Sequence, residues 1–450
     1  MMTLSVMVPI MIQNGITNFV NLLDNIMVGI IGTEQMSGIA IVNQLIFVFN
    51  LCIFGGMSGA GIFTAQFYGK GDEEGVRYTF RFKIYIALAI TMIGIMVFGF
   101  AGDDLIRLFL HQSGEAGDID ATFRYASQYI DVLLIGLLPF AISQAYAETL
   151  RETGETVLPM KAGIAAVLVN LIGNYIFIYG KFGAPRLGVI GAAAATVASR
   201  FVELLIIVIW THTHKEKNGF VRHAYSSMRI PGALTWKIIC KGTPLLLNET
   251  MWSAGMTVLM QLYSFRGLSV IAALNISSTI SNLFNIIFIA MGNSIAIILG
   301  QKLGAGKTEE AKEYSVKLIT FSVLCCLASG ALMALIAPLF PQIYNTTDEV
   351  KRLACSLIRI AAYCMPMYAF QNSCYFTLRS GGRTFITFLF DSVFVWTASI
   401  PLAYVLIHFT SMPITPLYVC CQMIELIKCL IGFILVKRGI WIRNITVTSE

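Results

Sequence analysis

The pattern of apolar and polar positions divides the chain into long apolar runs, separated by short stretches with glycine, proline or clustered charges. A transmembrane helix needs roughly 20 consecutive apolar residues, and each run meets or approaches that length. The pattern therefore predicts an all-α polytopic membrane protein with twelve transmembrane helices. The predicted helices cover residues 4–31, 37–65, 84–101, 128–148, 157–179, 188–211, 239–264, 269–299, 316–340, 353–377, 385–409 and 416–436.

The composition agrees with a membrane protein and excludes several other classes. Of the 450 residues, 56% are hydrophobic and 12% are charged, whereas a soluble domain carries about 25% charged residues. Disorder and a secreted disulfide scaffold are excluded by the same figures. The net charge of +6 is modest, and the basic residues show no clustering into a basic face. No nucleic-acid partner is therefore expected. The ten cysteines contain no C-x-x-C pair and are interpreted as small membrane hydrophobes.

The distribution of basic residues predicts the orientation. Lysine and arginine are about three times as frequent after even-numbered helices and in the C-terminal tail as in the other gaps. Both termini are therefore expected in the cytoplasm, in a multi-pass protein of the inner (plasma) membrane. No basic leader precedes the first apolar run, which disfavours a cleaved signal peptide. The predicted parts are an N-terminal six-helix lobe (1–211), a cytoplasmic linker (212–238), a C-terminal six-helix lobe (239–436) and a cytoplasmic tail (437–450).

The two halves resemble each other. Placing Pro9 on Pro244 gives an offset of 235 residues, and a later motif around Arg151 matches the one around Arg379 at an offset of 228. Because six helices separate the copies, both have the same orientation and form parallel, pseudo-symmetric repeats. The first offset also pairs Gly32 with Gly267, Asn50 with Asn285, Gln66 with Gln301, Gly69 with Gly304 and Gly71 with Gly306.

Helix 1 carries a polar stripe. Asn14, Asn18, Asn21 and Asn25 are spaced by four, three and four residues, which places them on one helical face beside Asp24. Unpaired amides are costly in hydrocarbon, so the stripe must face other helices or water. Hydrogen bonding between packed helices is the structural alternative. A carboxylate inside the membrane is a functional candidate, and Asp24 is expected to bind a cation in one state and release it in another.

Other polar residues inside the predicted helices form secondary candidates. Neutral oxygens around one carboxylate suit either a dehydrated monovalent cation or a carboxyl group that takes up a proton. Arg200 with Glu203 and Glu425 with Lys428 are interpreted as structural pairs, three residues apart on a helix. The further candidates are Asn43, Asn50, Asn170, Asn174 and Thr196 in the first half, and Glu249, Asn282, Asn285 and Asp391 in the second.

The sequence lacks the motifs of several other activities. The sequence contains no P-loop, so ATP is not the expected energy source. No convergent histidine or Ser/His set lies inside the membrane, which argues against an enzyme and against a metal site other than Na⁺ at Asp24. No cofactor is expected. The paired glycines at 69, 71, 304 and 306 are interpreted as turn formers.

The chain resembles the multidrug and toxic compound extrusion (MATE) family over essentially its whole length. The resemblance is carried by Asp24-Asn25-x-x-x-Gly29-x-x-Gly32, Gln66-x-x-Gly69-x-Gly71, Leu150-Arg151-x-x-Gly154-x-Thr156 with its repeat at Leu378-Arg379, Asn170-x-x-x-Asn174, and Gly188-x-x-Gly191 before Ala195-Thr196. It implies a secondary antiporter of two six-helix lobes that open alternately to either side. Such an antiporter expels organic, often cationic compounds in exchange for H⁺ or Na⁺.

By the family's pattern, the cation site would consist of Asp24, Asn170, Asn174 and Thr196. Many prokaryotic relatives have an aspartate where this chain has Asn174, which changes the charge of the site. Glu249 matches an acid of sodium-coupled and eukaryotic members. An acid that some relatives carry on helix 10 is replaced here by Tyr368.

The sequence thus predicts a monomeric, cation-coupled exporter in contact with membrane lipid. Its small organic substrate would lie in a central cavity near Asn18, Asn21, Asn282 and Asn285. The alternative is a flippase for lipid-linked oligosaccharides or other lipids, which would need a cavity richer in arginine. A major-facilitator transporter is disfavoured because the loop from Gly69 to Glu74 lacks that family's basic pattern. An intramembrane transferase or protease lacks its catalytic set.

Overall fold

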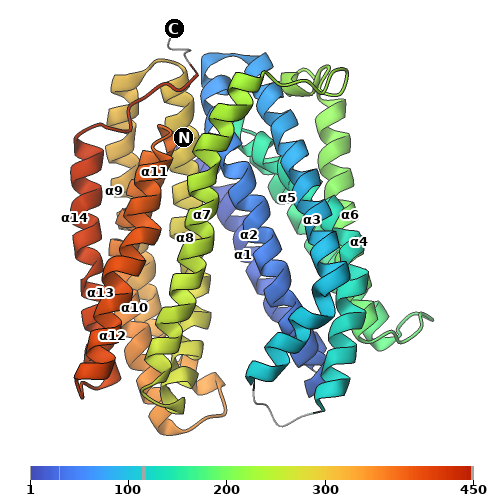
Figure 1. Cartoon of the computed structure of the whole chain (residues 1–450), viewed down its shortest axis with the longest axis vertical. Helices are drawn as coiled ribbons and strands as arrows, with labels where there is room; N and C mark the ends of the chain where they lie inside the picture. Colours follow the sequence, from blue (N-terminus) through green and yellow to red (C-terminus); the bar gives the residue numbers. More distant parts are fainter. Residues whose placement is uncertain (1, 30, 114–117, 447–450) are drawn as a thin grey trace. The chain divides into compact units, whose positions relative to one another are not determined.

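The computed structural model describes residues 2–29, 31–113 and 118–446, although the side chains at 2–5, 18–26 and 111–113 lie outside the described part. The described residues form helices joined by turns and loops and include no β-strand (Figure 1). The predicted all-α class is therefore confirmed. Ten of the described helical segments are long and apolar enough to cross a membrane.

Each predicted membrane span corresponds to one helical segment. The first ten are α1 (Met2–Gly29), α2 (Thr33–Lys70), α3 (Glu73–Ser113), α4 (Ile119–Glu152), α5 (Val157–Tyr179), α6 (Val189–Thr213), α7 (Gly232–Ser264), α8 (Leu268–Gly304), α9 (Thr308–Ile336) and α10 (Asp348–Ser380). The eleventh consists of α11 (Thr384–Phe388), η3 (Leu389–Val393), η4 (Val395–Ser399) and α12 (Ile400–Phe409), and the twelfth of α13 (Ile414–Met423) and α14 (Glu425–Lys437). Two short 3₁₀ turns, η1 (Gly219–Val221) and η2 (Phe340–Ile343), lie in connecting segments.

Most helices extend beyond their apolar runs because polar turns continue them. The clearest case is α3, which begins at Glu73 rather than at residue 84. The Asp72 side chain accepts a hydrogen bond from the Gly75 N–H at 2.8 Å, as an N-cap residue does. Arg81 and Lys83, which lie in the gap between the predicted spans 37–65 and 84–101, are therefore helical, and both are buried. Lys83 forms an ion pair with Glu152 at the end of α4.

The eleventh span is irregular. Residues 389–393 and 395–399 have π-helical hydrogen bonding, which widens the helix where Asp391 and Ser392 lie. Such π-helical turns occur often at functional positions. The predicted span over 385–409 matches this helical segment, although the apolar run gave no sign of the irregularity.

The chain divides into two compact units. The N-terminal unit comprises Val8–Thr64 and Asp72–Trp236, and the C-terminal unit comprises Met1–Met7, Ala65–Gly71 and Lys237–Glu450. The last residues of α2 thus belong to the C-terminal unit.

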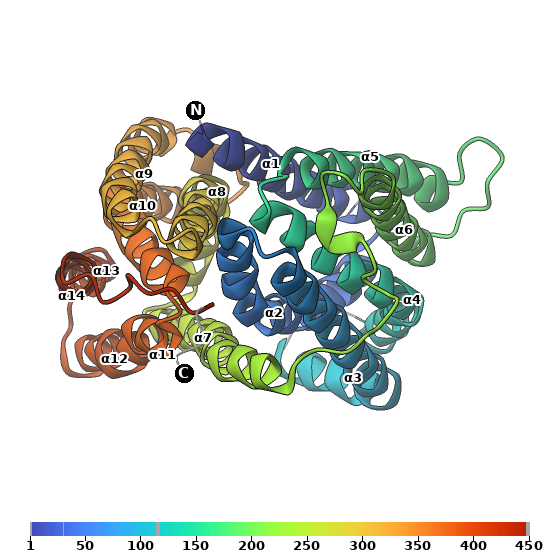
Figure 2. The same cartoon turned by 90° about the horizontal axis from the view of Figure 1, so that it is seen from above.

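Glycine allows close packing of α5 and α6 in the N-terminal unit, where the two helices run side by side (Figure 2). A Cβ atom at Gly173 would lie 2.8 Å from the Ala195 Cβ, and one at Gly191 would lie 2.7 Å from the Phe177 carbonyl oxygen. Small residues are the usual means of such approach between membrane helices. Gly191 of the motif Gly188-x-x-Gly191 therefore acts in packing, whereas Gly188 precedes α6 with positive φ.

The segment that follows α6 is anchored to α3. The Arg81 guanidinium donates hydrogen bonds to the carbonyl oxygens of His223 (2.9 Å), Ala224 (2.8 Å) and Arg229 (3.0 Å). In the same region, the Tyr146 hydroxyl is hydrogen-bonded to Tyr225 and to His212, at 2.5 and 3.0 Å. Residues 223–229 of the predicted linker are therefore docked on the N-terminal unit.

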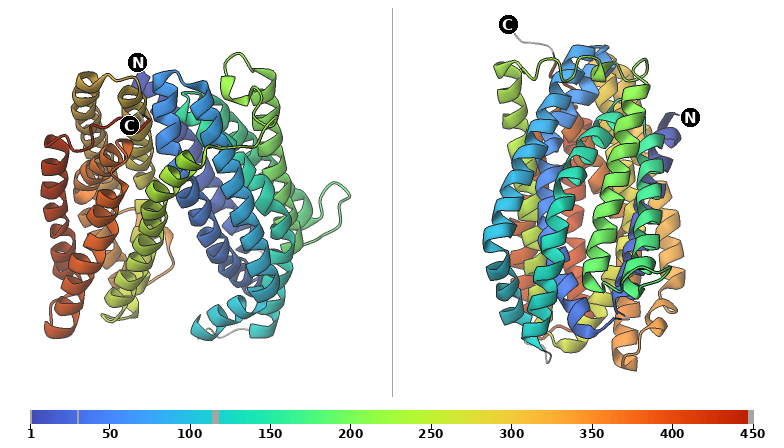
Figure 3. Two further views of the ribbon diagram at one scale, coloured as in Figure 1. Left: turned by 45° about the horizontal axis from the view of Figure 1, so that its top comes forward. Right: turned by 90° about the vertical axis from the view of Figure 1, so that its right-hand side faces the viewer.

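In the C-terminal unit, α8, α9 and α10 pack together around a large apolar core, and α14 runs beside the span from 384 to 409 (Figure 3). Gln66, from the end of α2, donates to the carbonyl oxygens of Ser380 (2.9 Å) and Arg443 (3.1 Å) and accepts from the Ile445 N–H (2.8 Å). Gly71 and Gly306 have positive φ in the turns after α2 and α8, which confirms their predicted role.

Candidate functional site

Three of the predicted site residues meet where α5 packs on α6. The Asn170 side chain donates to the Thr196 hydroxyl at 3.1 Å, and the Asn174 side chain donates to the side-chain oxygen Oδ1 of Asn170 at 3.3 Å. Asn170 and Asn174 are both buried and lie one turn apart on α5. The close approach at Gly173 places Thr196 within reach of Asn170. The structure thus brings Asn170, Asn174 and Thr196 together as one hydrogen-bonded cluster.

The fourth predicted member, Asp24, lies on α1, but its side chain is outside the described residues. The same holds for Asn18, Asn21 and Asn25, whereas Asn14 is described and is half-buried. The polar stripe on helix 1 therefore stays a prediction.

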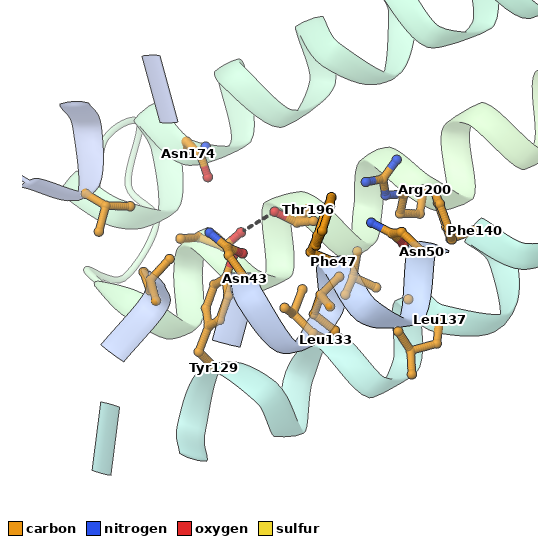
Figure 4. Close-up of a pocket in the computed structure, with 16 residues that line it drawn as sticks. Asn43, Phe47, Asn50, Tyr129, Leu133, Leu137, Phe140, Asn174, Thr196 and Arg200 are labelled. Atoms are coloured by element: carbon orange, nitrogen blue, oxygen red, sulfur yellow. Dashed lines mark hydrogen bonds between the residues drawn. The ribbon is translucent and has the colours of Figure 1, made fainter. Parts of the chain in front are cut away.

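A cavity of about 380 Å³ lies beside this cluster, within the N-terminal unit (Figure 4). Asn174 and Thr196 belong both to the cluster and to the cavity wall. Two polar side chains from α2, Asn43 and Asn50, also contribute to the cavity wall. The remaining described lining residues are Val28, Ile39, Ile46, Phe47, Tyr129, Leu133, Gly136, Leu137, Phe140, Ala192, Val197 and Arg200.

Arg200 brings a positive charge to the cavity. Its guanidinium lies 4.7 Å from the centre of the Phe140 ring and 3.6 Å from the Glu203 carboxylate. The predicted pair with Glu203 is thus present, at a separation longer than an ordinary hydrogen bond. In Figure 4, Arg200, Phe140 and Asn50 lie at one end of the cavity, and Asn174 lies at the other.

Asp391 is the centre of a polar network in the C-terminal unit. Its carboxylate accepts hydrogen bonds from Lys428 at 2.6 Å and from Asn248 at 3.1 Å. The Ser392 hydroxyl donates to the side-chain and backbone carbonyl oxygens of Asn248, at 2.8 and 2.7 Å. Lys428 is also 4.0 Å from Glu425, the partner predicted from sequence spacing. That pair is present, but the closer partner of Lys428 is Asp391, on another helix.

The other two candidates in this unit have separate surroundings. The Tyr368 hydroxyl donates to the Gln422 side chain, between α10 and α13. Glu249 is half-buried beside Asn248 on α7, and within the described part of the chain it has no hydrogen-bond or ion-pair partner. On α8, Asn282 is exposed and Asn285 is half-buried.

A comparison with known protein families decides the classification. The sequence model of the MatE family matches residues 9–176 and again residues 244–405. The chain belongs to the MatE family. The two matches begin at Pro9 and Pro244, the pair by which the halves of the sequence were aligned, which supports the predicted duplication. As a member of this family, the chain is a multi-pass membrane transporter and not an enzyme.

Curated relatives cover most of the chain. One is a probable multidrug resistance protein, NorM, of Thermotoga maritima, which is 24% identical over 89% of this chain and 84% of the relative. Another, of the same name, is from Halalkalibacterium halodurans and is 25% identical over 90% of this chain and 87% of the relative.

Solved MATE structures have the same fold. One is the outward-facing conformation of a multidrug resistance MATE transporter, with a TM-score of 0.86 and 20% identity over 97% of this chain and 95% of that one. A MATE protein in its bent conformation gives a TM-score of 0.87 and 20% identity over 97% and 94% of the two chains. The predicted twelve-helix fold is thereby confirmed.

Two features of this MatE-family chain were not predicted from its sequence. Arg200 was interpreted as half of a structural pair, although it also lines the cavity. Its spacing of four residues from Thr196 places both on one face of α6 and could have shown this. Asn248 precedes the candidate Glu249 but was not itself a candidate, and nothing in the sequence indicates that it bonds to Asp391, 143 residues away.

Proposed function

We propose that this MatE-family chain is a secondary antiporter that exports organic compounds across the plasma membrane in exchange for H⁺ or Na⁺. The family membership and the names of the relatives support multidrug efflux as the activity. The observation that carries the exchange is that Asn174 and Thr196 belong to both the hydrogen-bonded cluster and the cavity wall.

Shared residues provide a physical route to coupling. A cation bound at the cluster orients the oxygens of Asn170 and Thr196 toward itself, and a compound in the cavity contacts Thr196 from the other side. Each ligand therefore changes the affinity for the other, and such coupling is reciprocal. Competition of this kind is what exchange requires.

Asp24 supplies the charge in the proposal. Amide and hydroxyl oxygens beside one carboxylate suit a sodium ion, and the same carboxylate can instead take up a proton. Cation uptake by Asp24 from outside favours the outward-open state and releases the compound. Loss of the cation to the cytoplasm resets the cycle, because each ligand shifts the balance only through its different affinity for the two states.

Efflux from proteoliposomes tests the proposal. A fluorescent organic cation is loaded on one side, and its movement is recorded under a pH gradient and then under a sodium gradient of equal size. In the wild type, one of the two gradients should drive efflux of the dye. Asp24→Asn should abolish gradient-driven efflux, whereas Asp103→Asn should not, because Asp103 is an exposed acid on α3 whose one hydrogen-bond partner among the described residues is Ser127. Full efflux by Asp24→Asn would refute the role of this carboxylate.

A flippase for lipid-linked oligosaccharides is not favoured, since the curated relatives reported above are named multidrug resistance proteins. Arg200 is the one charged residue among the described lining residues of the cavity, which is fewer than a phosphate-bearing lipid would need.

A further inference from the structure

Three basic side chains gather at one end of the C-terminal unit. Lys241 lies on α7, Arg383 lies in the turn before α11, and Arg443 lies in the C-terminal tail. The Lys241 Cε atom is 4.0 Å from the position that a Cβ atom of Gly382 would take, next to Arg383 in the chain. The charges of Arg383 and Arg443 both repel the Lys241 ammonium group. The fold thus brings together three like charges from segments far apart in the sequence.

No carboxylate neutralises this basic cluster in the described part of the chain. None of its three side chains forms an ion pair with an acidic residue there, and the groups whose charges act on Lys241 include no carboxylate. By contrast, Lys302 at the end of α8 in the same unit is paired with Glu310. Like charges held together without a counter-ion lower the stability of a fold. Such a local cost is expected where a functional site requires it.

The C-terminal tail is fixed where it carries Arg443. A Cβ atom at Gly381 would overlap the Trp441 carbonyl oxygen, so the tail crosses the turn before α11 in direct contact (Figure 2). The Trp441 side chain is buried, and Gln66 donates a hydrogen bond to the Arg443 carbonyl oxygen at 3.1 Å. The place of Arg443 beside this turn is therefore built into the fold.

The charged groups of the basic cluster are accessible. Arg443 is exposed, and Lys241 and Arg383 are half-buried. The Arg383 Nε–H donates to the Ile440 carbonyl oxygen at 2.8 Å, whereas its other two guanidinium nitrogens form no hydrogen bond within the described residues. A guanidinium with two such nitrogens can bind a phosphate group through parallel N–H groups. The cluster therefore has the donors that an anion requires.

The basic cluster is confined to the second repeat. The offset of 235 residues pairs Lys241 with Val6, and the offset of 228 pairs Arg383 with Glu155. Glu155 has a different role, since its carboxylate accepts a hydrogen bond from the Leu158 N–H at 3.1 Å at the start of α5. A general enrichment of basic residues, which sets the orientation of a membrane protein, does not require this placement.

The basic cluster lies at the level where lipid headgroups are expected. Lys241 and Arg383 lie at the starts of two predicted spans, 239–264 and 385–409, and Arg443 follows the end of a third. Basic pockets at the ends of membrane helices bind the phosphorylated headgroups of anionic lipids.

We propose that Lys241, Arg383 and Arg443 form a binding site for the phosphate group of an anionic phospholipid such as phosphatidylglycerol. The phosphate balances the three charges, and the acyl chains lie against exposed apolar side chains of the adjoining span, among them Phe385 and Leu389. Phosphatidylcholine fits less well, because its choline group brings a further positive charge to the cluster. The inference concerns lipid binding and does not depend on the proposed export function.

Lipid titration of the purified protein in a neutral detergent tests the inference. Native mass spectrometry counts the bound lipid molecules, first with dioleoyl phosphatidylglycerol and then with dioleoyl phosphatidylcholine. The wild type should bind the first molecule of phosphatidylglycerol about tenfold more tightly, since an added positive charge beside three others costs at least that factor. Inorganic phosphate at the same concentration should not displace the lipid, because it has no acyl chains to bury.

Two variants remove a charge from the basic cluster without removing a described hydrogen bond. Lys241→Gln and Arg443→Gln should each lower the affinity for phosphatidylglycerol about tenfold and leave that for phosphatidylcholine unchanged. Their melting temperatures without lipid should stay equal to that of the wild type or rise, because repulsion is relieved, whereas a structural role would lower them. Lys437→Gln is the matched control, since Lys437 is an exposed cation at the end of α14 that contacts the Phe433 ring at 5.6 Å. It should bind both lipids as the wild type does.

Three results would overturn the inference. Equal affinity of the wild type for the two lipids would remove the preference for an anionic headgroup. An equal loss of affinity in Lys437→Gln would show a general attraction between anionic lipid and this end of the unit. Displacement of phosphatidylglycerol by inorganic phosphate at the same concentration would assign the cluster to a soluble phosphate instead. Dye efflux under an ion gradient tests the export function alone, so the two proposals can fail separately.

Discussion

Gly69 and Gly304 occupy equivalent places at the crossing of α2 and α8, where each faces the backbone carbonyl of a glutamine on the other helix. A Cβ atom at Gly69 would overlap the Gln301 carbonyl oxygen, and one at Gly304 would overlap that of Gln66. These are the residues that the offset of 235 pairs between the two repeats. The motif Gln-x-x-Gly therefore builds a symmetric helix contact within the C-terminal unit, rather than the turn predicted for these two glycines.

Replacing either glycine should weaken this crossing. In Gly69→Ala or Gly304→Ala the added methyl group meets a backbone oxygen, which cannot move aside as a side chain can. Forcing an extra methyl group into a packed contact costs about 1–3 kcal/mol. The melting temperature of the purified protein should fall in both variants. Gly99→Ala on α3, where a Cβ atom would meet no neighbouring atom within 4 Å, should not lower it.

The contact between Asp391 and Lys428 is expected to stabilise the C-terminal unit. The two side chains are 20% and 7% exposed, so removing one charge leaves the other nearly buried without its partner. Breaking such a pair costs about 3 kcal/mol or more. Lys428→Met alone should therefore lower the stability strongly, and Asp391→Asn combined with Lys428→Met should recover much of the loss.

A double-mutant cycle measures the coupling between these two residues. The sum of the single effects should exceed the effect of the double variant by more than 1 kcal/mol. Glu425→Gln combined with Lys428→Met is the control, because Glu425 lies 4.0 Å from Lys428 and should show weaker coupling. If the effects of the Asp391 and Lys428 substitutions on stability are additive, the pair has no structural role, and Asp391 is left as a candidate for ion binding.

The membrane spans and the repeat could be predicted from the sequence because both depend on local composition and on residues such as Pro9 and Pro244 at fixed spacing. The polar ends of the helices could not be predicted in this way. Arg81 and Lys83 resemble loop charges in a hydropathy pattern, yet α3 already includes them and buries them against the segment after α6 and against Glu152. Their burial depends on hydrogen-bond partners that lie 66 or more residues away.

The contacts of the candidate-site residues also include some that the sequence predicts and some that it does not. The pairing of Asn170 with Asn174 follows from helical spacing, and the resemblance to the family placed Thr196, already a polar candidate, in the same site. The partnership of Lys428 with Asp391 could not be predicted, because it joins α14 to the π-helical part of the eleventh span. Spacing along one helix favoured Glu425 instead. Contacts across helices decide which of several nearby charges forms the closest pair.

Thr196 should control the affinity for the coupling ion. Thr196→Val keeps the shape of the side chain but removes the oxygen that accepts the Asn170 N–H at 3.1 Å. One oxygen of the proposed ion site is lost and Asn170 can reorient, so we expect the ion concentration for half-maximal efflux to rise about tenfold. The measurement is dye efflux from proteoliposomes over a range of sodium concentration or pH.

Thr79→Val is the matched control for this variant. Thr79 accepts a hydrogen bond from Thr64 at 2.9 Å. Both side chains are fully buried within the N-terminal unit, and neither lines the cavity. Loss of that bond should lower the melting temperature without changing the ion dependence. An equal shift of the ion dependence in both variants would show that Thr196 acts only through general stability.

Arg81 should protect the segment after α6 from proteolysis. Its guanidinium binds three backbone carbonyls between residues 223 and 229, and the segment contains trypsin sites at Arg222 and Arg229. Arg81→Ala removes all three hydrogen bonds, so the segment should open more often and be cut at least several-fold faster. Arg81→Lys should protect only partly, because one ammonium group cannot reach three carbonyls in the planar geometry that arginine provides.

Arg77→Ala is the control for this prediction. Arg77 lies one turn earlier on α3 and makes no described contact with the segment, so this variant should be cut at the wild-type rate. Equal cleavage of Arg81→Ala and the wild type would mean that the segment is held by its aromatic contacts alone, chiefly those of Tyr225 with Tyr146 and Phe80.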